Sequence, residues 1–218
     1  MKVSPWDFLY TAICVIGLSL LSGGILFAGL ANFLIQNLGV YGYLANVAIL
    51  VTVYGVLSGF LLQIFLMVRP IGQGELDSEG ADFAYWKLLT MIHYFGLRAL
   101  FLFNLAPAMP LIGRLFGAKI GKNVAIGGIL DSPFLIEIGD LCILGRGSII
   151  SGNVSLSGRT NVGPVKIGPG STIGVYSLVM PHTTIGARVT IVPYSVVVSG
   201  TNIPDGEVWK GNPARKWQ

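Results

Sequence analysis

Side chains that could carry out acid–base chemistry are scarce in this sequence of 218 residues. It contains two histidines, His93 and His182, and two cysteines, Cys14 and Cys142. An imidazole is the side chain best suited to take up and return a proton near neutral pH. The four residues do not follow the spacing of zinc ligands or of a disulfide framework. These residues therefore offer two imidazoles that could act as a base, and they predict no metal site. His182 lies within a regular repeat (residues 120–197), and His93 lies outside it.

Few other charged residues could assist such a base. Asp131 and Glu137 flank an irregular stretch, Ser132-Pro133-Phe134, where either carboxylate could orient a base or bind an amine. Arg159 lies in the polar segment 157–164, which interrupts the repeat. Loops held by a rigid scaffold often carry function, so we expect this segment to contribute to a substrate site. A tolerated insertion without function is the alternative.

The distribution of charged residues along the chain indicates which part of the protein lies in a membrane. Phe8–Val68 is a run of 61 residues without Asp, Glu, Lys, Arg or His. A run of this length is typical of lipid-embedded segments and is too long for a cleaved signal peptide. The net charge is +4, but the 14 basic residues are scattered and form no nucleic-acid motif. We therefore expect a bilayer partner and no nucleic-acid partner.

The charge-free run is long enough for two spanning helices. We expect the first at about Phe8–Ile35 and the second at about Val40–Val68, separated near Gly39. Because Lys2 and Arg69 flank the run, both ends are expected on the cytoplasmic side. Gly55 and Gly59 form a GxxxG pattern, which indicates a close helix contact within the hairpin or between protomers.

Two further segments precede the repeat. Ile71–Asp82 is rich in acids and is expected to be a solvated cytoplasmic loop. Ala84–Phe103 is apolar but carries Lys87, His93 and Arg98, so it is interpreted as an amphipathic helix at the interface, with a short third span as the alternative. Leu111–Ala118 is expected to be a linker.

From Ile120 onward an aliphatic residue recurs every six positions, often followed by glycine. The pattern fails at Ser132 and is offset after Leu156, where the next aliphatic position, Ile167, follows at a spacing of eleven instead of six or twelve. A period of six fits neither a helix nor a flat strand. It predicts a triangular solenoid in which three hexads make one coil, aliphatic residues stack inside, and neighbouring coils satisfy each other's backbone groups. The aliphatic positions are 120, 126, 138, 144, 150, 156, 167, 173, 179, 185, 191 and 197.

This register, together with the closing segment Ile203–Arg215, resembles the hexapeptide-repeat acyltransferases, which fold as a left-handed parallel β-helix. Gly117–Gly121 is similar to the entry segment of membrane-attached members such as the tail domains of poly-lysine synthetases. The expected fold class is thus α + β, with a transmembrane helical hairpin (1–70), a cytoplasmic loop and interfacial helix (71–118), and a β-helix domain (119–218).

The resemblance implies acyl transfer from an acyl-CoA or acetyl-CoA co-substrate, or from a carrier protein, to a hydroxyl or amine. It also implies a homotrimer with sites between subunits and a histidine base, here His182. A small or membrane-borne, lipid-linked acceptor follows from the hairpin. The candidate substrate-binding residues are Asn153, Arg159, Asp131 and Glu137. The candidate coenzyme A-binding residues are Ser177, Ser195, Lys210, Arg215 and Lys216.

The sequence departs from the family at one position. Membrane-attached relatives carry the catalytic histidine just before the segment that interrupts the repeat, and here that position falls at Gly152 or Asn153. Neither residue can act as a base. A non-catalytic scaffold or binding module at the membrane is therefore the alternative to an integral-membrane acyltransferase.

Overall fold

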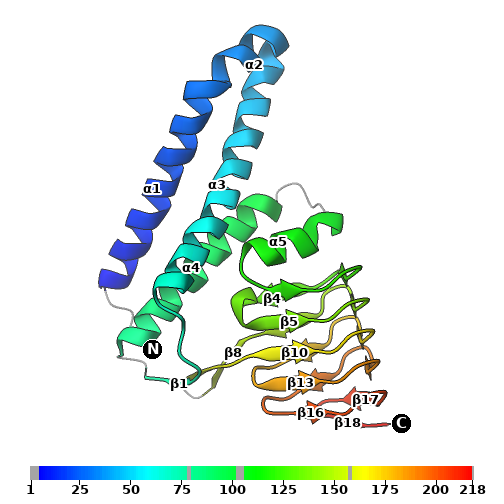
Figure 1. The fold of residues 1–218 in the computed structure, drawn as a ribbon. Helices are drawn as coiled ribbons and strands as arrows, with labels where there is room; N and C mark the ends of the chain where they lie inside the picture. Colours follow the sequence, from blue (N-terminus) through cyan, green and yellow to red (C-terminus); the bar gives the residue numbers. More distant parts are fainter. Residues whose placement is uncertain (1–4, 78–79, 102–105, 157–158, 218) are drawn as a thin grey trace. The chain divides into compact units, whose positions relative to one another are not determined.

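The computed structural model describes residues 5–77, 80–101, 106–156 and 159–217 (Figure 1). Its chain divides into two compact units. One is helical and comprises Lys2–Pro70 with Ala84–Asn104, and the other comprises Ile71–Phe83 with Leu105–Gln218.

The helical unit begins with two long apolar helices that lie side by side, α1 (Pro5–Gly29) and α3 (Val40–Val68) (Figure 1). By length and composition, Phe8–Gly29 and Val40–Val68 could each cross a membrane, with mean hydropathies of 2.1 and 2.2. The first apolar helix ends at Gly29 and not near Ile35, because the backbone leaves helical geometry at Leu30 and a short helix, α2 (Ala31–Leu38), follows. Gly39 then turns the chain into α3 with a φ of 56°.

Helix α4 (Ala81–Phe101) completes the helical unit and packs closely on α3. The Tyr85 hydroxyl donates to the carbonyl oxygens of Phe65 (2.7 Å) and Arg69 (2.8 Å) at the end of α3. At Gly55 the helices approach so closely that an added Cβ would lie 2.5 Å from Leu100 Cγ and 3.0 Å from the Gly96 carbonyl oxygen. The GxxxG pattern was expected to mark a contact within the hairpin or between protomers, but the helix that lies close to Gly55 in the structure is α4.

Gly55→Ala is expected to destabilise the helical unit by about 1–2 kcal/mol, because the new methyl group must displace Leu100 and the α4 backbone. Unfolding in micelles, followed by circular dichroism, measures the change. Gly24→Ala is the matched control, since a Cβ there meets nothing within 4 Å and alanine favours a helix. Equal stabilities of the two variants would contradict the tight α3–α4 contact.

The second unit is a parallel β-solenoid of about five coils, capped at its start by helix. The segment 106–115, expected to be partly linker, forms a 3-10 turn (Ala106–Ala108) and helix α5 (Met109–Leu115). The Arg114 side chain donates to the carbonyl oxygens of Ile120 (2.8 Å) and Gly121 (2.6 Å) in the first coil. A Cβ at Gly113 would lie 2.7 Å from Ile120 Cδ1. Helix α5 thus covers the open end of the core, as a solenoid requires.

Three parallel sheets form the faces of the prism (Figure 1). The β2–β16 sheet contains β2 (Lys119–Ile120), β5 (Ile136–Ile138), β10 (Val165–Ile167), β13 (Thr183–Ile185) and β16 (Asn202–Ile203). The β3–β18 sheet contains β3 (Ala125–Ile126), β6 (Ile143–Leu144), β11 (Thr172–Ile173), β14 (Thr190–Ile191), β17 (Val208–Gly211) and the antiparallel β18 (Ala214–Lys216). The β4–β15 sheet contains β4 (Ile129–Asp131), β7 (Ile149–Ser151), β12 (Leu178–Val179) and β15 (Val196–Val197).

The core consists of three columns of aliphatic side chains, one behind each sheet. Strand register aligns the residues of the first column, Ile120, Ile138, Ile167, Ile185 and Ile203. All five are buried. The expected stacking of every sixth residue is confirmed, and burying each isoleucine contributes about 1.5–3 kcal/mol.

Two positions of the repeat depart from the expectation. In the first coil Leu130 fills the column in place of Ser132, because β4 begins two residues early and a 3-10 turn (Pro133–Leu135) restores the length. Leu156 is 67% exposed and outside the core. The interruption therefore starts at Gly152 and not after Leu156.

The interruption is an antiparallel β-hairpin formed by β8 (Asn153–Leu156) and β9 (Arg159–Val162). The acidic segment expected to be a solvated loop supplies a third strand, β1 (Gly74–Leu76), which pairs with β9. Leu76 is buried in this small sheet. The chain that follows α3 is thus built into the β-solenoid unit.

Candidate functional site

The β8–β9 hairpin projects from one edge of the prism, between the β4–β15 and β2–β16 sheets, which we call the hairpin edge. Along this edge, backbone hydrogen bonds join successive coils: Gly152 N–H donates to Asp131 O (2.9 Å) and Gly200 N–H to Pro181 O (3.2 Å). Gly163 N–H donates to Gly152 O (2.9 Å) and closes the hairpin where it leaves the prism. His182 lies on this edge, after β12, so the structure brings it together with the hairpin.

The backbone conformation of His182 and two neighbouring residues fix the position of its side chain. Its backbone adopts the left-handed conformation (φ 59°), which turns the corner into β13. Its ring lies against Gly163 so closely that an added Cβ would lie well within 3.0 Å of three ring atoms. Its Nε2 is 2.8 Å from Asn161 Oδ1 on β9. The side chain is half-buried beneath the hairpin.

Arg159 lies on the same hairpin and pairs with β1. Its guanidinium is 3.1 Å from Glu75 Oε1. The register places Glu75 opposite Asn161, so β9 is the central strand between β1 and β8. Both side chains of the ion pair are more than half exposed, which limits its contribution to about 1 kcal/mol or less.

Asp131 and Asn153, both predicted substrate-binding residues, contact each other at this edge. Asp131 Oδ2 accepts hydrogen bonds from Ser151 Oγ (2.9 Å) and Asn153 Nδ2 (3.0 Å). Asn153 Nδ2 also donates to Ser132 Oγ (2.8 Å). The side-chain amide of Asn153 thus connects the start of the hairpin to the first coil.

Glu137 is on the outer face of the β2–β16 sheet, in strand β5. Its carboxylate pairs with Lys119 (2.5 Å) on one neighbouring strand and lies 3.9 Å from Lys166 on the other. The hydrogen bond from Lys119 and the charges of both lysines hold the pKa of Glu137 below its usual range. This arrangement gives Glu137 a role in pairing coils.

Glu137→Gln is expected to reduce the loss of stability in acid. A carboxyl whose pKa is lower in the folded state stabilises it above the unfolded pKa, about 4.3. That contribution is lost as pH falls through the folded value. Because the side chain is 39% exposed, the effect stays below about 1 kcal/mol. Unfolding curves at pH 7 and pH 3 measure it, and Lys119→Met is expected to give the same change. An unaltered pH dependence in both variants would contradict the assignment.

Ser177 and Ser195, predicted to contact coenzyme A, are buried inside the prism. Ser177 Oγ accepts from the Ser195 N–H (3.2 Å), and Ser195 Oγ accepts from the Gly211 N–H (3.1 Å). Their hydroxyl groups bind backbone N–H groups of the next coil and do not face outward.

The cations of the closing segment lie at the far end of the solenoid. Lys210 Nζ is 4.0 Å from the centre of the Trp217 ring, and Lys216 Nζ is 2.6 Å from Glu207 Oε1. Arg215 pairs with Lys210 across β17 and β18. These three residues are grouped, but the structure does not bring them to the hairpin edge.

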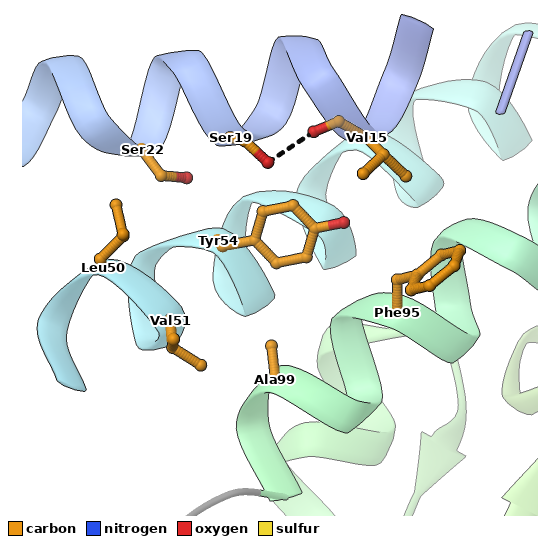
Figure 2. Close-up of a pocket in the computed structure, with 8 residues that line it drawn as sticks. All are labelled: Val15, Ser19, Ser22, Leu50, Val51, Tyr54, Phe95 and Ala99. Carbon is orange, nitrogen blue, oxygen red and sulfur yellow. Dashed lines mark hydrogen bonds between the residues drawn. The ribbon is translucent and has the colours of Figure 1, made fainter. Parts of the chain in front are cut away.

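His93 is buried in α4 of the helical unit. That unit contains a cavity of about 330 Å³ between α1, α3 and α4, shown in Figure 2. Its walls are mostly apolar, with the hydroxyls of Ser19, Ser22 and Tyr54 among them. Ser19 and Ser22 bond to carbonyl oxygens of their own helix. Among the described lining residues there is no carboxylate, imidazole or amine. The lining residues are Val15, Ser19, Ser22, Leu50, Val51, Tyr54, Phe95 and Ala99.

Among the residues that the structure describes, no group of three or more potential ligands that could hold a metal ion occurs. Burial raises the pKa of the Cys142 thiol, which disfavours a thiolate nucleophile.

The sequence did not single out Asn161 or Gly163, the residues in contact with His182. Both lie in the segment 157–164 that the broken register marked. Their pairing with His182 depends on how the hairpin folds back, which no spacing encodes.

Comparisons with known proteins agree with the repeat. Residues 164–199 match the family model for the bacterial transferase hexapeptide (six repeats). The chain is 25% identical over 178 residues, 80% of its length, to delta-poly-L-ornithine synthetase of Acinetobacter baumannii, of which it spans 13%. This match is longer than residues 119–218, so it also takes in residues before the repeat.

Solved structures of acetyltransferases are similar to the solenoid. A hexapeptide-repeat-containing acetyltransferase of Vibrio cholerae is 25% identical, with 47% of this chain and 62% of that chain covered and a TM-score of 0.43. A mutant of perosamine N-acetyltransferase from Caulobacter crescentus, in complex with CoA and GDP-perosamine, is 23% identical, with 47% and 51% covered and a TM-score of 0.36. The chain thus spans about half to three fifths of these structures. Together, the stacked coils and the matched repeats show that the C-terminal region is a hexapeptide-repeat β-solenoid.

Proposed function

We propose that this protein is a membrane-anchored acyltransferase that moves an acetyl or other acyl group from a coenzyme A thioester, or from a carrier protein, to a hydroxyl or amine. The observation that carries the proposal is the placement of His182. A half-buried imidazole, held by Asn161 and Gly163 beneath a hairpin, is what a general base at a protein surface requires.

The reaction needs one proton acceptor. The imidazole of His182 takes the proton from the acceptor O–H or N–H while the acceptor atom attacks the thioester carbon. The tetrahedral oxyanion then collapses, the carbon–sulfur bond breaks, and the thiolate leaves and recovers the proton from the imidazolium. Backbone N–H groups near the site would stabilise the oxyanion.

The acceptor is proposed to be membrane-borne. Only 17% and 22% of the most apolar windows of Phe8–Gly29 and Val40–Val68 are buried within the chain, whereas the core helix of a soluble protein is mostly buried. An anchored solenoid would meet lipid-linked acceptors at the bilayer surface. The charge flanks, Lys2 and Arg69, favour a cytoplasmic position for the solenoid.

A second copy of this chain is the proposed partner of the β4–β15 sheet. One aliphatic ladder runs down its outer face, whereas the outer face of the β2–β16 sheet carries the charged ladder of Glu137. An apolar face next to the hairpin edge is suited to subunit contact, as in a homotrimer. The ladder consists of Ile129, Ile149, Leu178 and Val196.

The remaining assignments are ligand contacts. Asp131, Asn153 and Arg159 share the hairpin edge with His182 and are proposed to contact the acceptor. Lys210, Arg215 and Lys216 are proposed to contact phosphates of coenzyme A, in which case Lys216 exchanges its pairing with Glu207 for the ligand.

Thioester turnover by the full chain in lipid nanodiscs tests the proposal. Acetyl-CoA and longer acyl-CoAs are supplied with a lipid extract, and release of the free thiol is followed together with label transfer to lipid. Turnover that requires the lipid fraction is expected. Absence of thiol release with every thioester and acceptor class would overturn it.

One observation favours a non-catalytic scaffold instead. Asn153, at the family's usual base position, has its amide nitrogen bonded to Asp131 and Ser132, and an amide cannot act as a general base. A scaffold would bind a partner or ligand at the hairpin edge without thiol release, so the same assay separates the two functions.

A further inference from the structure

We propose that Asn161 is a positioning residue that fixes the ring orientation and the tautomer of His182. This inference rests on the proposed function for its catalytic consequence, although the contact itself can be tested without any turnover. Nothing in the hexad pattern points to Asn161, because it lies outside the repeat.

The argument starts from the chemistry of the two groups. An amide oxygen only accepts hydrogen bonds, so the 2.8 Å contact requires Nε2 of His182 to carry a hydrogen. A neutral imidazole has one N–H and one lone pair. When Asn161 Oδ1 accepts from Nε2, the lone pair is therefore on Nδ1, and Nδ1 becomes the atom that takes the acceptor proton.

The backbone around Asn161 is held on both sides. Register places Asn161 opposite Val154 on β8 and opposite Glu75 on β1. The neighbouring side chains Thr160 and Val162 are buried. An amide on the central strand of a three-stranded sheet has little freedom, so its oxygen is presented to His182 at a fixed place.

The ring itself has few alternatives. Gly163 lies against it, and the left-handed corner fixes the direction of its Cβ. The charged groups nearest in the small sheet are Glu75 and Arg159, which neutralise each other. The amide of Asn161 is thus the one polar side chain that the structure records in hydrogen-bond contact with His182 among the described residues.

Nitrogen-15 NMR of histidine in the full chain, in nanodiscs, tests the contact directly. The chain has two histidines, and the signal missing in His182→Gln is that of His182. In the unchanged chain the neutral ring is expected to carry its hydrogen on Nε2. Asn161→Leu, similar in size but without an acceptor, is expected to give a mixture of tautomers. Asn161→Asp is expected to restore the Nε2–H form, because a carboxylate oxygen also accepts a hydrogen bond from Nε2.

Controls separate positioning from folding and from the proposed reaction. Asn202→Leu, at an exposed position on strand β16, should leave the His182 signal unchanged. In turnover, Asn161→Leu is expected to lower kcat at least tenfold with little change in KM. An unaltered tautomer in Asn161→Leu, in a folded chain, would refute the positioning role. The expected NMR result without any thioester turnover would leave positioning intact and defeat the acyltransferase proposal.

Discussion

His182→Ala is expected to lower kcat for thioester turnover by a factor of about 10² to 10⁴, with KM changed little. General base catalysis by a positioned side chain contributes this much, and no second imidazole is described at the hairpin edge. The measurement is steady-state kinetics with saturating acyl-CoA in nanodiscs, at pH 6 to 9. The pH dependence of any residual rate should lose the limb that reports the base.

His182→Asn provides a second variant that preserves the corner. Asparagine tolerates the left-handed conformation better than alanine, so the fold should persist while the base is gone. Tyr194→Asn is the matched control, since Tyr194 also occupies a left-handed corner (φ 61°) but on another edge, and is 70% exposed. Full turnover in folded His182→Asn would remove His182 from the mechanism.

Gly163→Ala is the second change with a large expected effect. The methyl group would overlap the His182 ring, which must move and give up its contact with Asn161. We expect kcat to fall at least tenfold and the free energy of unfolding to fall by about 1–2 kcal/mol, from crowding and one lost hydrogen bond. Chemical denaturation and turnover measure the two effects.

A double-mutant cycle makes this prediction specific. In the His182→Ala background the ring is absent, so the same Gly163→Ala change should cost less than about 0.5 kcal/mol. Gly72→Ala is the control, because a Cβ at Gly72 meets nothing within 4 Å. Equal costs in both backgrounds would show that Gly163 is required for a reason unrelated to His182.

The sequence was sufficient for most of the solenoid. Each inward position requires an aliphatic side chain in every coil. The regular spacing of Ile167, Ile185 and Ile203 is therefore enough to predict that they stack in one column. The two apolar helices were likewise predictable, since a long run without charged residues is typical of apolar helices. Their ends were harder to predict, because α1 ends at Gly29 and the backbone leaves helical geometry at Leu30, a residue type that does not usually end a helix.

The errors arose where local geometry is decided by packing. Leu156 continues the period of six by coincidence, and only the pairing of β8 with β9 takes it out of the core. Ser132 seemed a gap, whereas an early strand brings Leu130 into the column. Strand β1 was not foreseen, because three residues with an acidic neighbourhood become a strand only when β9 offers an edge.

The candidate site was predictable in part. The break in register correctly marked where side chains gather, and His182, Asp131, Asn153 and Arg159 lie there. Ser177 and Ser195 were predicted to contact coenzyme A, but both side chains point inward and accept hydrogen bonds from backbone N–H groups inside the prism. Asn161 could not be predicted as a site residue, because its role depends on a contact with His182, which lies 21 residues away in the sequence.

The regular part of the solenoid constrains how its length can change. Columns stay continuous only if every coil contributes the same positions, so whole-coil deletions or duplications of eighteen residues, the spacing from Ile167 to Ile185, preserve the stacking. A deletion of seventeen or nineteen would turn core side chains outward in all later coils. The distance between the hairpin edge and the C-terminal cations can therefore be changed only by whole coils, so engineered variants would differ in this distance by fixed increments.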